Sequence, residues 1–334
     1  MSNQTLDNNE QGAQNKNSLF FTGTEILKMP EDKSPYLWQP YIQKGQISIL
    51  AGSSDVGKST FLRQLAMQVS CGANDFLGLP LITQYKKAVF YSTEDNLYAT
   101  KLVLDEQAKG LGTDKLDGIY FLFEAEKPLD AINSFLANNK VDLVVIDSFG
   151  DTFEGTINDS GSVRRFMKGF SKMATDNDCA VVLLHHIGKG KDENQANKSN
   201  LLGSVAIEAK ARLVMELKSS KEENKRELWF TKGNNLSPQQ KLKALSVALS
   251  EHRTFSLDGD IAITEKETDK KSKFNNKAEM VAKIVELKQK GLSYDKVKAE
   301  IDLLFPDSKP SSGIIKEWYK EWEQSQENSN ADAA

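Results

Sequence analysis

Short apolar runs alternate with segments of helical spacing over the first three quarters of the chain. The runs are rich in Val, Ile, Leu and Phe, which is typical of strands, whereas the segments between them resemble amphipathic helices. This alternation predicts an α/β fold with a mostly parallel sheet and helices on both faces. The expected strands cover residues 46–52, 87–94, 117–123, 140–148, 178–186, 211–218 and 226–232.

The pattern within these runs also indicates how some of the strands are placed. Residues 140–148 are apolar at nearly every position, as expected of a central strand that is buried on both faces. Only the polar segment 218–225 separates the last two expected strands. These two strands are therefore expected to pair antiparallel.

The pattern changes beyond residue 263, where an expected α/β domain over residues 19–263 ends. Residues 264–276 are highly charged and lack hydrophobic periodicity, which predicts a linker. Helical spacing returns over 277–290, 294–304 and 312–322, which predicts a small all-α module spanning 277–322. The Asn/Gln-rich residues 1–18 and the acidic residues 323–334 are expected to be disordered tails, because neither can bury enough apolar surface.

Composition narrows the class of protein. Of the 334 residues, 43 are Lys or Arg and 47 are Asp or Glu, so the net charge is −4 and contact with nucleic acid must come from local patches. The two cysteines, Cys71 and Cys179, are too few for a disulfide framework or a cysteine metal site. The first residues lack the features of a signal peptide, and no apolar run is long enough to cross a bilayer. We therefore expect a cytoplasmic protein without a membrane partner.

The strongest motif follows the strand at 46–52 and precedes an apolar-periodic helix. It matches G-x-x-x-x-G-K-[ST], the phosphate-binding P-loop. Backbone N–H groups of such a loop surround an anion, Lys58 neutralises the terminal phosphates and Ser59 holds Mg²⁺. ATP and Mg²⁺ are therefore the expected ligands. The predicted nucleotide-binding residues are Gly52, Ser53, Ser54, Asp55, Val56, Gly57, Lys58, Ser59 and Thr60.

Acidic residues at the ends of two further strands predict the rest of a hydrolytic site. Asp147 has the form of a Walker-B aspartate and is the second expected Mg²⁺ ligand, although it could instead cap a helix. Because Ser148 follows it rather than an acid, the general base must come from elsewhere. Glu94 is the first candidate and Asp95 the second, since the strand before them ends at the edge where ligands of open α/β sheets bind. A helix-capping role remains the alternative for this acidic pair.

Two histidines end the strand at 178–186. One of them, His185 or His186, is expected to donate a hydrogen bond to the γ-phosphate, and periodicity does not decide which. We assign the role to His186 and note that the other is an ordinary candidate for a buried structural histidine. Arg63 is the only arginine close to the P-loop in the sequence.

In this order, the P-loop, Glu94, Asp147 and the histidine pair resemble the RecA-like ATPases. The nearest resemblance is to the branch of plasmid-encoded hexameric replicative helicases and DnaB-type helicases. The segment from Leu202 to Arg212 is similar to the G-S-x-A-x-x-x-x-x-R block of that branch. The resemblance implies a homo-oligomer, a hexamer in this branch, in which Arg212 is the arginine finger of a neighbouring subunit's nucleotide site. It also implies Lys232 as a second cation acting between subunits.

Two segments are candidate contacts to DNA. The loop at 188–198 carries Lys189, Lys191 and Lys198, and loops at this place line the channel of RecA-like motors; a plain solvated loop is the alternative. Residues 285–322 resemble the helix-turn-helix modules of resolvases and transposon-associated proteins, with Lys316 and Lys320 on the expected recognition helix. The region from Lys270 to Trp322 contains twelve lysines and eight acidic residues. A helical protein-binding module remains the alternative.

The sequence as a whole predicts a Mg²⁺-dependent ATPase that acts on DNA. A hexameric helicase or translocase of a plasmid or another mobile element is the first interpretation. The alternative is an ATP-switched DNA-binding regulatory or accessory replication protein that does not unwind DNA.

Overall fold

The computed structural model describes residues 20–28, 35–157, 159–188, 196–197, 204–241, 243–262, 277–306 and 309–331. The chain divides into two compact units. The larger comprises the described residues up to Ser237 together with Leu245–Gly259, and the smaller comprises Pro238–Ala244 and the described residues from Asp260 onward. The expected tail at 1–18 and the expected linker at 264–276 lie outside the described residues, so the domain boundaries that we placed there stay predictions.

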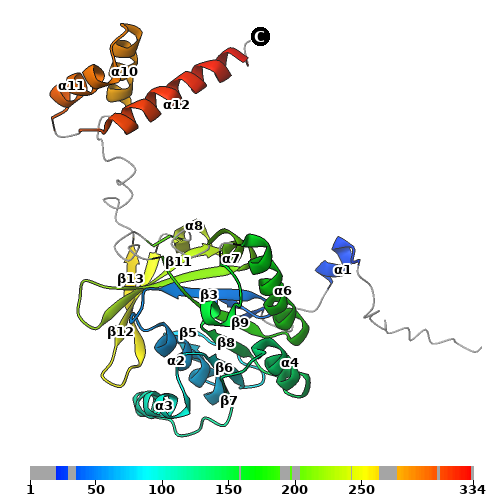
Figure 1. Cartoon of the computed structure of the whole chain (residues 1–334). Coiled ribbons are helices and arrows are strands. Elements are labelled where there is room, and N and C mark those ends of the chain that lie inside the picture. The colour runs from blue at the N-terminus through cyan, green and yellow to red at the C-terminus, as the bar shows by residue number, and fades with distance from the viewer. Residues whose placement is uncertain are drawn as a thin grey trace, which may run out of the picture. The chain divides into compact units, whose positions relative to one another are not determined.

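A nine-stranded sheet forms the centre of the larger unit, with the strand order β13-β12-β11-β10-β3-β9-β8-β6-β7 (Figure 1). The strands from β10 to β7 in this order run parallel, and β11 pairs antiparallel with β10. The fold is thus the predicted mostly parallel α/β sheet. The strand bounds are β3 Ile47–Gly52, β6 Ala88–Ser92, β7 Ile119–Phe123, β8 Leu143–Asp147, β9 Ala180–His186, β10 Leu213–Ser219, β11 Lys225–Gly233, β12 Lys243–Leu249 and β13 Phe255–Ala262.

Helices cover both faces of this sheet because the strands alternate their side chains between two hydrophobic cores. In β8, for example, Val145 packs in the core that contains α2, whereas Val144 and Ile146 pack in the core that contains α4 and α6. The helix bounds are α2 Lys58–Cys71, α3 Leu97–Leu111, α4 Pro128–Asn138, α5 Phe149–Thr152, α6 Ser160–Asn177, α7 Ser204–Lys210 and α8 Pro238–Lys241.

All seven expected strands are present, and the structure adds several that the apolar runs did not indicate. The additional strands are β1 Tyr36–Trp38, β2 Ile42–Gln43, β4 Asp75–Phe76, β5 Leu79–Pro80, β12 and β13. A short helix, α1 Gly23–Leu27, begins at a capping box formed by Thr22 and Glu25. Among the helices of the described residues, none combines the length and hydropathy needed to span a bilayer.

The smaller unit contains the three expected C-terminal helices, α10 Lys277–Gln289, α11 Tyr294–Leu304 and α12 Ser312–Ala331. They enclose a core of their own, in which Ile284, Ile301 and Ile315 are fully buried. The helix α12 continues to Ala331, so the expectation of disorder from residue 323 is wrong as far as 331. Residues 323–331 contain no Pro or Gly and include Glu and Gln, which favour helix continuation.

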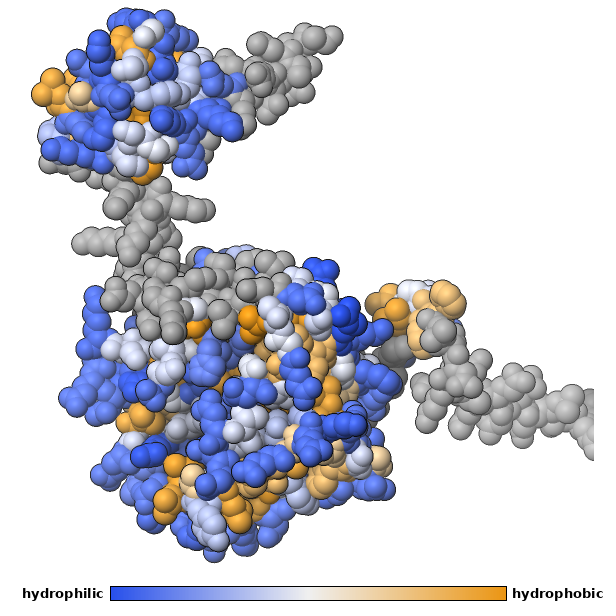
Figure 2. Space-filling model, viewed as in Figure 1, coloured by the Kyte–Doolittle hydropathy of each residue, from blue (hydrophilic) through white to orange (hydrophobic). Residues whose placement is uncertain are grey.

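The surface of both units is mainly hydrophilic in the view of Figure 2, with apolar residues interspersed. Scattered apolar residues on a surface are ordinary, but three lie close together in sequence on one helix. Leu97, Tyr98 and Leu102 of α3 are all exposed. Only Asn96, the N-cap of α3, separates this part of the helix from the acidic pair Glu94–Asp95.

Candidate functional site

The P-loop occupies the turn between β3 and α2. Two of its residues have a positive φ, Asp55 at 61° and Gly57 at 100°. A Cβ atom at Gly52 would lie 2.5 Å from the backbone oxygen of Leu217, and one at Gly57 would lie 3.1 Å from the ring of Phe255. At both positions a side chain would come too close to a neighbouring atom, so glycine is required. At Gly57 the left-handed backbone is a second reason for glycine.

Lys58 and Ser59 stand at the start of α2, where the helix dipole adds positive potential. The Nζ atom of Lys58 donates a hydrogen bond to the backbone oxygen of Ser53 at 2.6 Å, which folds this side chain back over the loop. Ser59 lies close enough to the Asp147 carboxyl to lower its pKa. The loop and the end of β8 thus meet at one point, as sequence reasoning expected for the two Mg²⁺ ligands.

The carboxylate of Asp147 is only 3% exposed, and its environment suits a cation. The pKa of this carboxyl is raised to about 6: burial, the largest cause, and the neighbouring Glu94 raise it, while Ser59 and Arg63 act in the opposite direction. Its Oδ1 atom accepts no hydrogen bond within the described part of the chain. A buried carboxylate oxygen with an unused lone pair beside a serine hydroxyl is a fitting donor set for Mg²⁺, which prefers oxygen ligands.

The register of the parallel strands brings the remaining predicted groups to the same edge. Gly52 lies opposite His186, and Ser92 lies opposite Asp147, so β3, β9, β6 and β8 all end together. The Nε2 atom of His186 is 3.7 Å from the Oε1 atom of Glu94. Both side chains are accessible to a ligand, with 37% and 58% exposure respectively.

The structure separates the members of the two pairs that the sequence left undecided. His185 is buried and packs edge-to-face on Phe149, whereas the neighbouring His186 faces the P-loop. Asp95 is engaged by the buried guanidinium of Arg63, with the Nη2 and Oδ2 atoms 3.1 Å apart. Of each pair, His186 and Glu94 line the cavity beside the P-loop, whereas His185 and Asp95 are not among its lining residues.

These groups surround a cavity of about 360 Å³ at the carboxyl edge of the sheet. Arg253, from the turn between β12 and β13, also lines it, which sequence reasoning missed. A second arginine, Arg226 of β11, donates from Nε to the backbone oxygen of the P-loop residue Val56 at 3.1 Å. The cavity is lined by Ser54, Asp55, Gly57, Lys58, Ser59, Thr60, Glu94, Leu184, His186 and Arg253.

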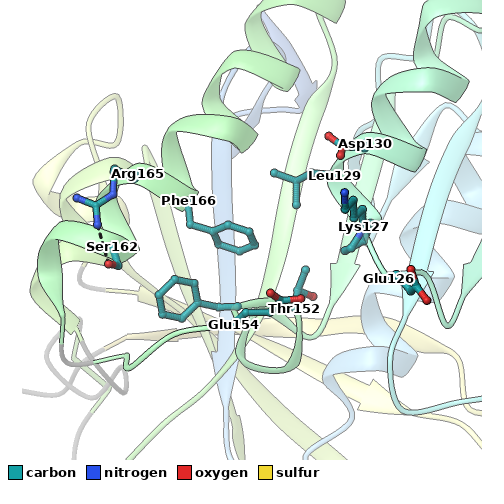
Figure 3. A pocket seen from close by; sticks show the side chains of 11 residues that line it. Glu126, Lys127, Leu129, Asp130, Thr152, Glu154, Ser162, Arg165 and Phe166 are labelled. Carbon is teal, nitrogen blue, oxygen red and sulfur yellow. Dashed lines mark hydrogen bonds between the residues drawn. The ribbon is translucent and has the colours of Figure 1, made fainter.

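A second pocket of similar volume, about 370 Å³, is lined by residues of α4, α5, α6 and the segments flanking them (Figure 3). Phe166 and Leu129 form apolar parts of its wall, and three acids and two bases surround them. It contains none of the predicted site residues within the described chain. Its excess of carboxylates makes it a poor binding place for phosphates. The charged residues are Glu126, Asp130, Glu154, Lys127 and Arg165.

Of the two predicted intersubunit cations, Arg212 lies far from this chain's own P-loop. The backbone N–H of Arg212 donates to the oxygen of Ile47 at the start of β3, and its Nε donates to Gln46 at 3.3 Å. Five residues of strand, roughly 16 Å, separate Ile47 from the P-loop at Gly52. The Nζ atom of Lys232 donates to the backbone oxygen of Glu208 in α7 at 2.5 Å. Within one subunit, Arg212 therefore cannot contact a nucleotide in the P-loop.

The sheet order and the P-loop together define a RecA-like P-loop ATPase fold. The chain belongs to the AAA domain family, whose family model matches residues 20–192. A solved structure described as that of a DnaB-like replicative helicase and its interactions with primase is similar with a TM-score of 0.51 at 17% sequence identity. The similarity covers 65% of this chain and 58% of that one, so the chain spans little more than half of that protein's length.

Proposed function

We propose that the protein is a Mg²⁺-dependent ATPase that acts on DNA as a hexameric helicase or translocase of a plasmid or another mobile element. The observation that carries the proposal is the cavity in which the P-loop, Glu94 and His186 face one another above the buried Asp147. Its groups match the needs of phosphoryl transfer, which depends mainly on positioning and electrostatic stabilisation. The similarity to a replicative helicase supports the choice of DNA as the target.

Each group has a role in this proposal. Lys58 and the P-loop amides, from Gly52 to Thr60, bind the phosphates of ATP, and Ser59 and Asp147 hold Mg²⁺. Mg²⁺ would neutralise charge that develops on the phosphates. Glu94 orients and deprotonates the attacking water, and His186 donates a hydrogen bond to the γ-phosphate.

Arg212 and Lys232 act between subunits in the proposed oligomer. Arg212 is exposed at the amino edge of the parallel strands, whereas the P-loop lies at their carboxyl edge. Arg212 can therefore reach a nucleotide only in a neighbouring copy. The exposed apolar residues of α3 described above support an assembly in which this side of the cavity faces another subunit.

The C-terminal helices are the proposed first contact to duplex DNA, in the manner of a helix-turn-helix-like module. Lys316 and Lys320 are both exposed on α12, one turn apart. The Nζ atoms of Lys316 and Lys288 lie 5.4 Å and 4.1 Å from the ring centre of Tyr294, so two cations gather around one aromatic ring. The loop at 188–198, most of which lies outside the described residues, is the proposed second contact.

The local positive charge of this region is unevenly distributed. From Lys277 to Trp322 there are nine lysines against eight acids, whereas Lys270, Lys271 and Lys273 precede the helices and lie outside the described residues. Binding by the helices must therefore depend on a few well-placed lysines and not on overall charge.

Reversing the charge of Lys316 and Lys320 together is expected to weaken duplex binding and to reduce its salt dependence. The slope of log affinity against log salt should fall by roughly one unit for each phosphate that the protein no longer neutralises. Lys296→Glu is the matched control, because Lys296 is exposed on α11 two residues from Tyr294 and thus on a different side of that helix. Fluorescence anisotropy over a salt series measures both quantities, and basal ATPase should be unchanged.

An unchanged duplex affinity in the Lys316→Glu, Lys320→Glu protein would assign the module to contacts with protein. It would also make the lysines of the 188–198 loop the leading DNA contacts. The separate hydrophobic core of α10–α12 favours one alternative function, an ATP-switched DNA-binding regulatory or accessory replication protein, because a module with its own core can act as a tether.

The decisive experiment compares ATPase rates with and without single-stranded DNA, together with strand displacement and the solution mass. The proposal expects ATP hydrolysis that single-stranded DNA stimulates, displacement of a paired strand and the mass of six chains. Lys58→Ala should abolish all turnover and serves as the background control. Hydrolysis without stimulation or displacement would favour the regulatory alternative, and no ATP binding by the unaltered chain would reject both.

A further inference from the structure

The turn between β12 and β13, Ser250–Thr254, is attached to the P-loop helix by two buried glutamines. Gln64 of α2 exchanges both hydrogen bonds with the backbone of Phe255: its Nε2 atom donates at 2.8 Å and its Oε1 atom accepts at 2.6 Å. Gln107 of α3 donates from Nε2 to the backbone oxygens of Thr60 at 2.9 Å and Arg253 at 3.1 Å. The turn is thus tied to the first turn of α2.

Apolar packing fixes the same turn against the loop that binds phosphate. The ring of Phe255 packs edge-on against Phe61 of α2, with the ring centres 5.5 Å apart. The same ring fills the space where a Cβ atom of Gly57 would lie. Contacts on both sides of Arg253 therefore fix the position of the turn. A turn that is fixed in this way can hold the Arg253 side chain in a defined place.

Arg253 stands at a position that the turn itself defines. Its backbone has φ 56°, the left-handed conformation expected of the last residue in a short hairpin loop, here closed by hydrogen bonds from the Arg253 N–H to the oxygen of Ser250 and from the Ser250 N–H to the oxygen of Thr254. Its side chain lines the cavity of the P-loop, beside Ser59 and Thr60, and forms no ion pair with any described residue. Arg63, by contrast, is buried and paired with Asp95. The cavity therefore receives a second cation besides Lys58.

We propose that Arg253 binds a phosphate of the nucleotide held by the P-loop of the same chain. This inference rests on the proposed ATPase function and adds a binding residue to it. A guanidinium is planar and donates two parallel hydrogen bonds to phosphate oxygens, so it adds a directed contact that the single ammonium of Lys58 does not supply. Because its turn is held in place without any ligand, Arg253 strengthens binding of ATP and ADP alike, unlike a cation that acts only in the transition state.

The test uses Arg253→Gly and Arg253→Lys in the full chain, with His252→Ala as the matched control. Glycine suits the left-handed backbone, so Arg253→Gly should unfold at the same temperature as the unaltered chain or a higher one. His252 lies on the same turn but contacts Glu106 and not the cavity. Any loss of binding in Arg253→Gly that is absent from His252→Ala is then due to the guanidinium and not to the fold of the turn.

Titration with fluorescent ADP and competition by inorganic tripolyphosphate measure the effect. Arg253→Gly should weaken both ligands by on the order of ten-fold to one-hundred-fold, the usual loss for a hydrogen bond to a charged group. Arg253→Lys should recover part of that loss, and His252→Ala should bind normally.

Three results would overturn the inference. Unchanged affinity for both ligands in Arg253→Gly would show that Arg253 touches neither, while the ATPase proposal would stand. A loss for ADP without a loss for tripolyphosphate would mean a contact to the base or sugar. A slower hydrolysis with normal binding would place Arg253 in the transition state only. If the unaltered chain binds neither ligand, the proposed function itself fails.

Discussion

Glu94→Gln is expected to bind ATP with nearly normal affinity and to hydrolyse it on the order of 10²-fold more slowly, in line with the loss of a general base. The amide keeps the size of the side chain but accepts a proton poorly, and Glu94 is exposed in the cavity within 3.7 Å of His186. Binding of a fluorescent ATP analogue and single-turnover hydrolysis measure the two quantities separately.

Asp95→Asn is the matched control for this prediction. Asp95 pairs with Arg63, a buried cation, so its replacement should lower the thermal midpoint by leaving that charge without its partner. Hydrolysis should change less than in Glu94→Gln. Near-normal turnover by Glu94→Gln, together with a large loss in Asp95→Asn, would transfer the role of base to Asp95.

Arg212→Ala is expected to bind ATP normally and to lose hydrolysis by on the order of 10³-fold, because an arginine finger stabilises charge that develops in the transition state. The sharper measurement mixes Arg212→Ala with Lys58→Ala chains, each inactive by itself. Some interfaces in the mixture join an intact P-loop to an intact Arg212, so part of the activity should return.

The position of Arg212 makes this test informative. Arg212 and the P-loop of the same chain lie at opposite edges of the parallel strands. Arg212 therefore cannot act directly on a nucleotide that is bound to its own chain. Mixed oligomers verified by mass that regain no activity would show that Arg212 has a structural role only, for instance through its hydrogen bond to Gln46.

The parallel half of the fold was predictable because its strands are buried on both faces and appear as continuous apolar runs. The antiparallel extension was not fully predictable. In β12, Ala244, Leu245 and Val247 are buried, but the other four residues are exposed or half-buried. A strand with one partly exposed face has a weaker sequence signal than a central strand.

The difference between the parallel strands and the antiparallel extension also explains which site residues the sequence did not predict. Three predicted site residues lie at or just after the ends of apolar runs, namely Glu94, Asp147 and His186. Because the carboxyl ends of parallel strands meet at one edge of the sheet, the sequence predicts that these three residues lie close together. Arg253 and Arg226 come from the antiparallel extension, and the bond from Gln64 to Phe255 spans 191 residues of sequence. The choice between His185 and His186 depended on burial, which two adjacent histidines in one run do not reveal.

The distance between Arg212 and its own P-loop has a consequence for when the protein acts. If Arg212 acts in the nucleotide site of a neighbouring chain, an isolated chain contains every required residue but has no complete nucleotide site. The rate per chain would rise steeply as chains become numerous enough to associate. The number of copies that a cell makes would then act as the switch for the enzyme.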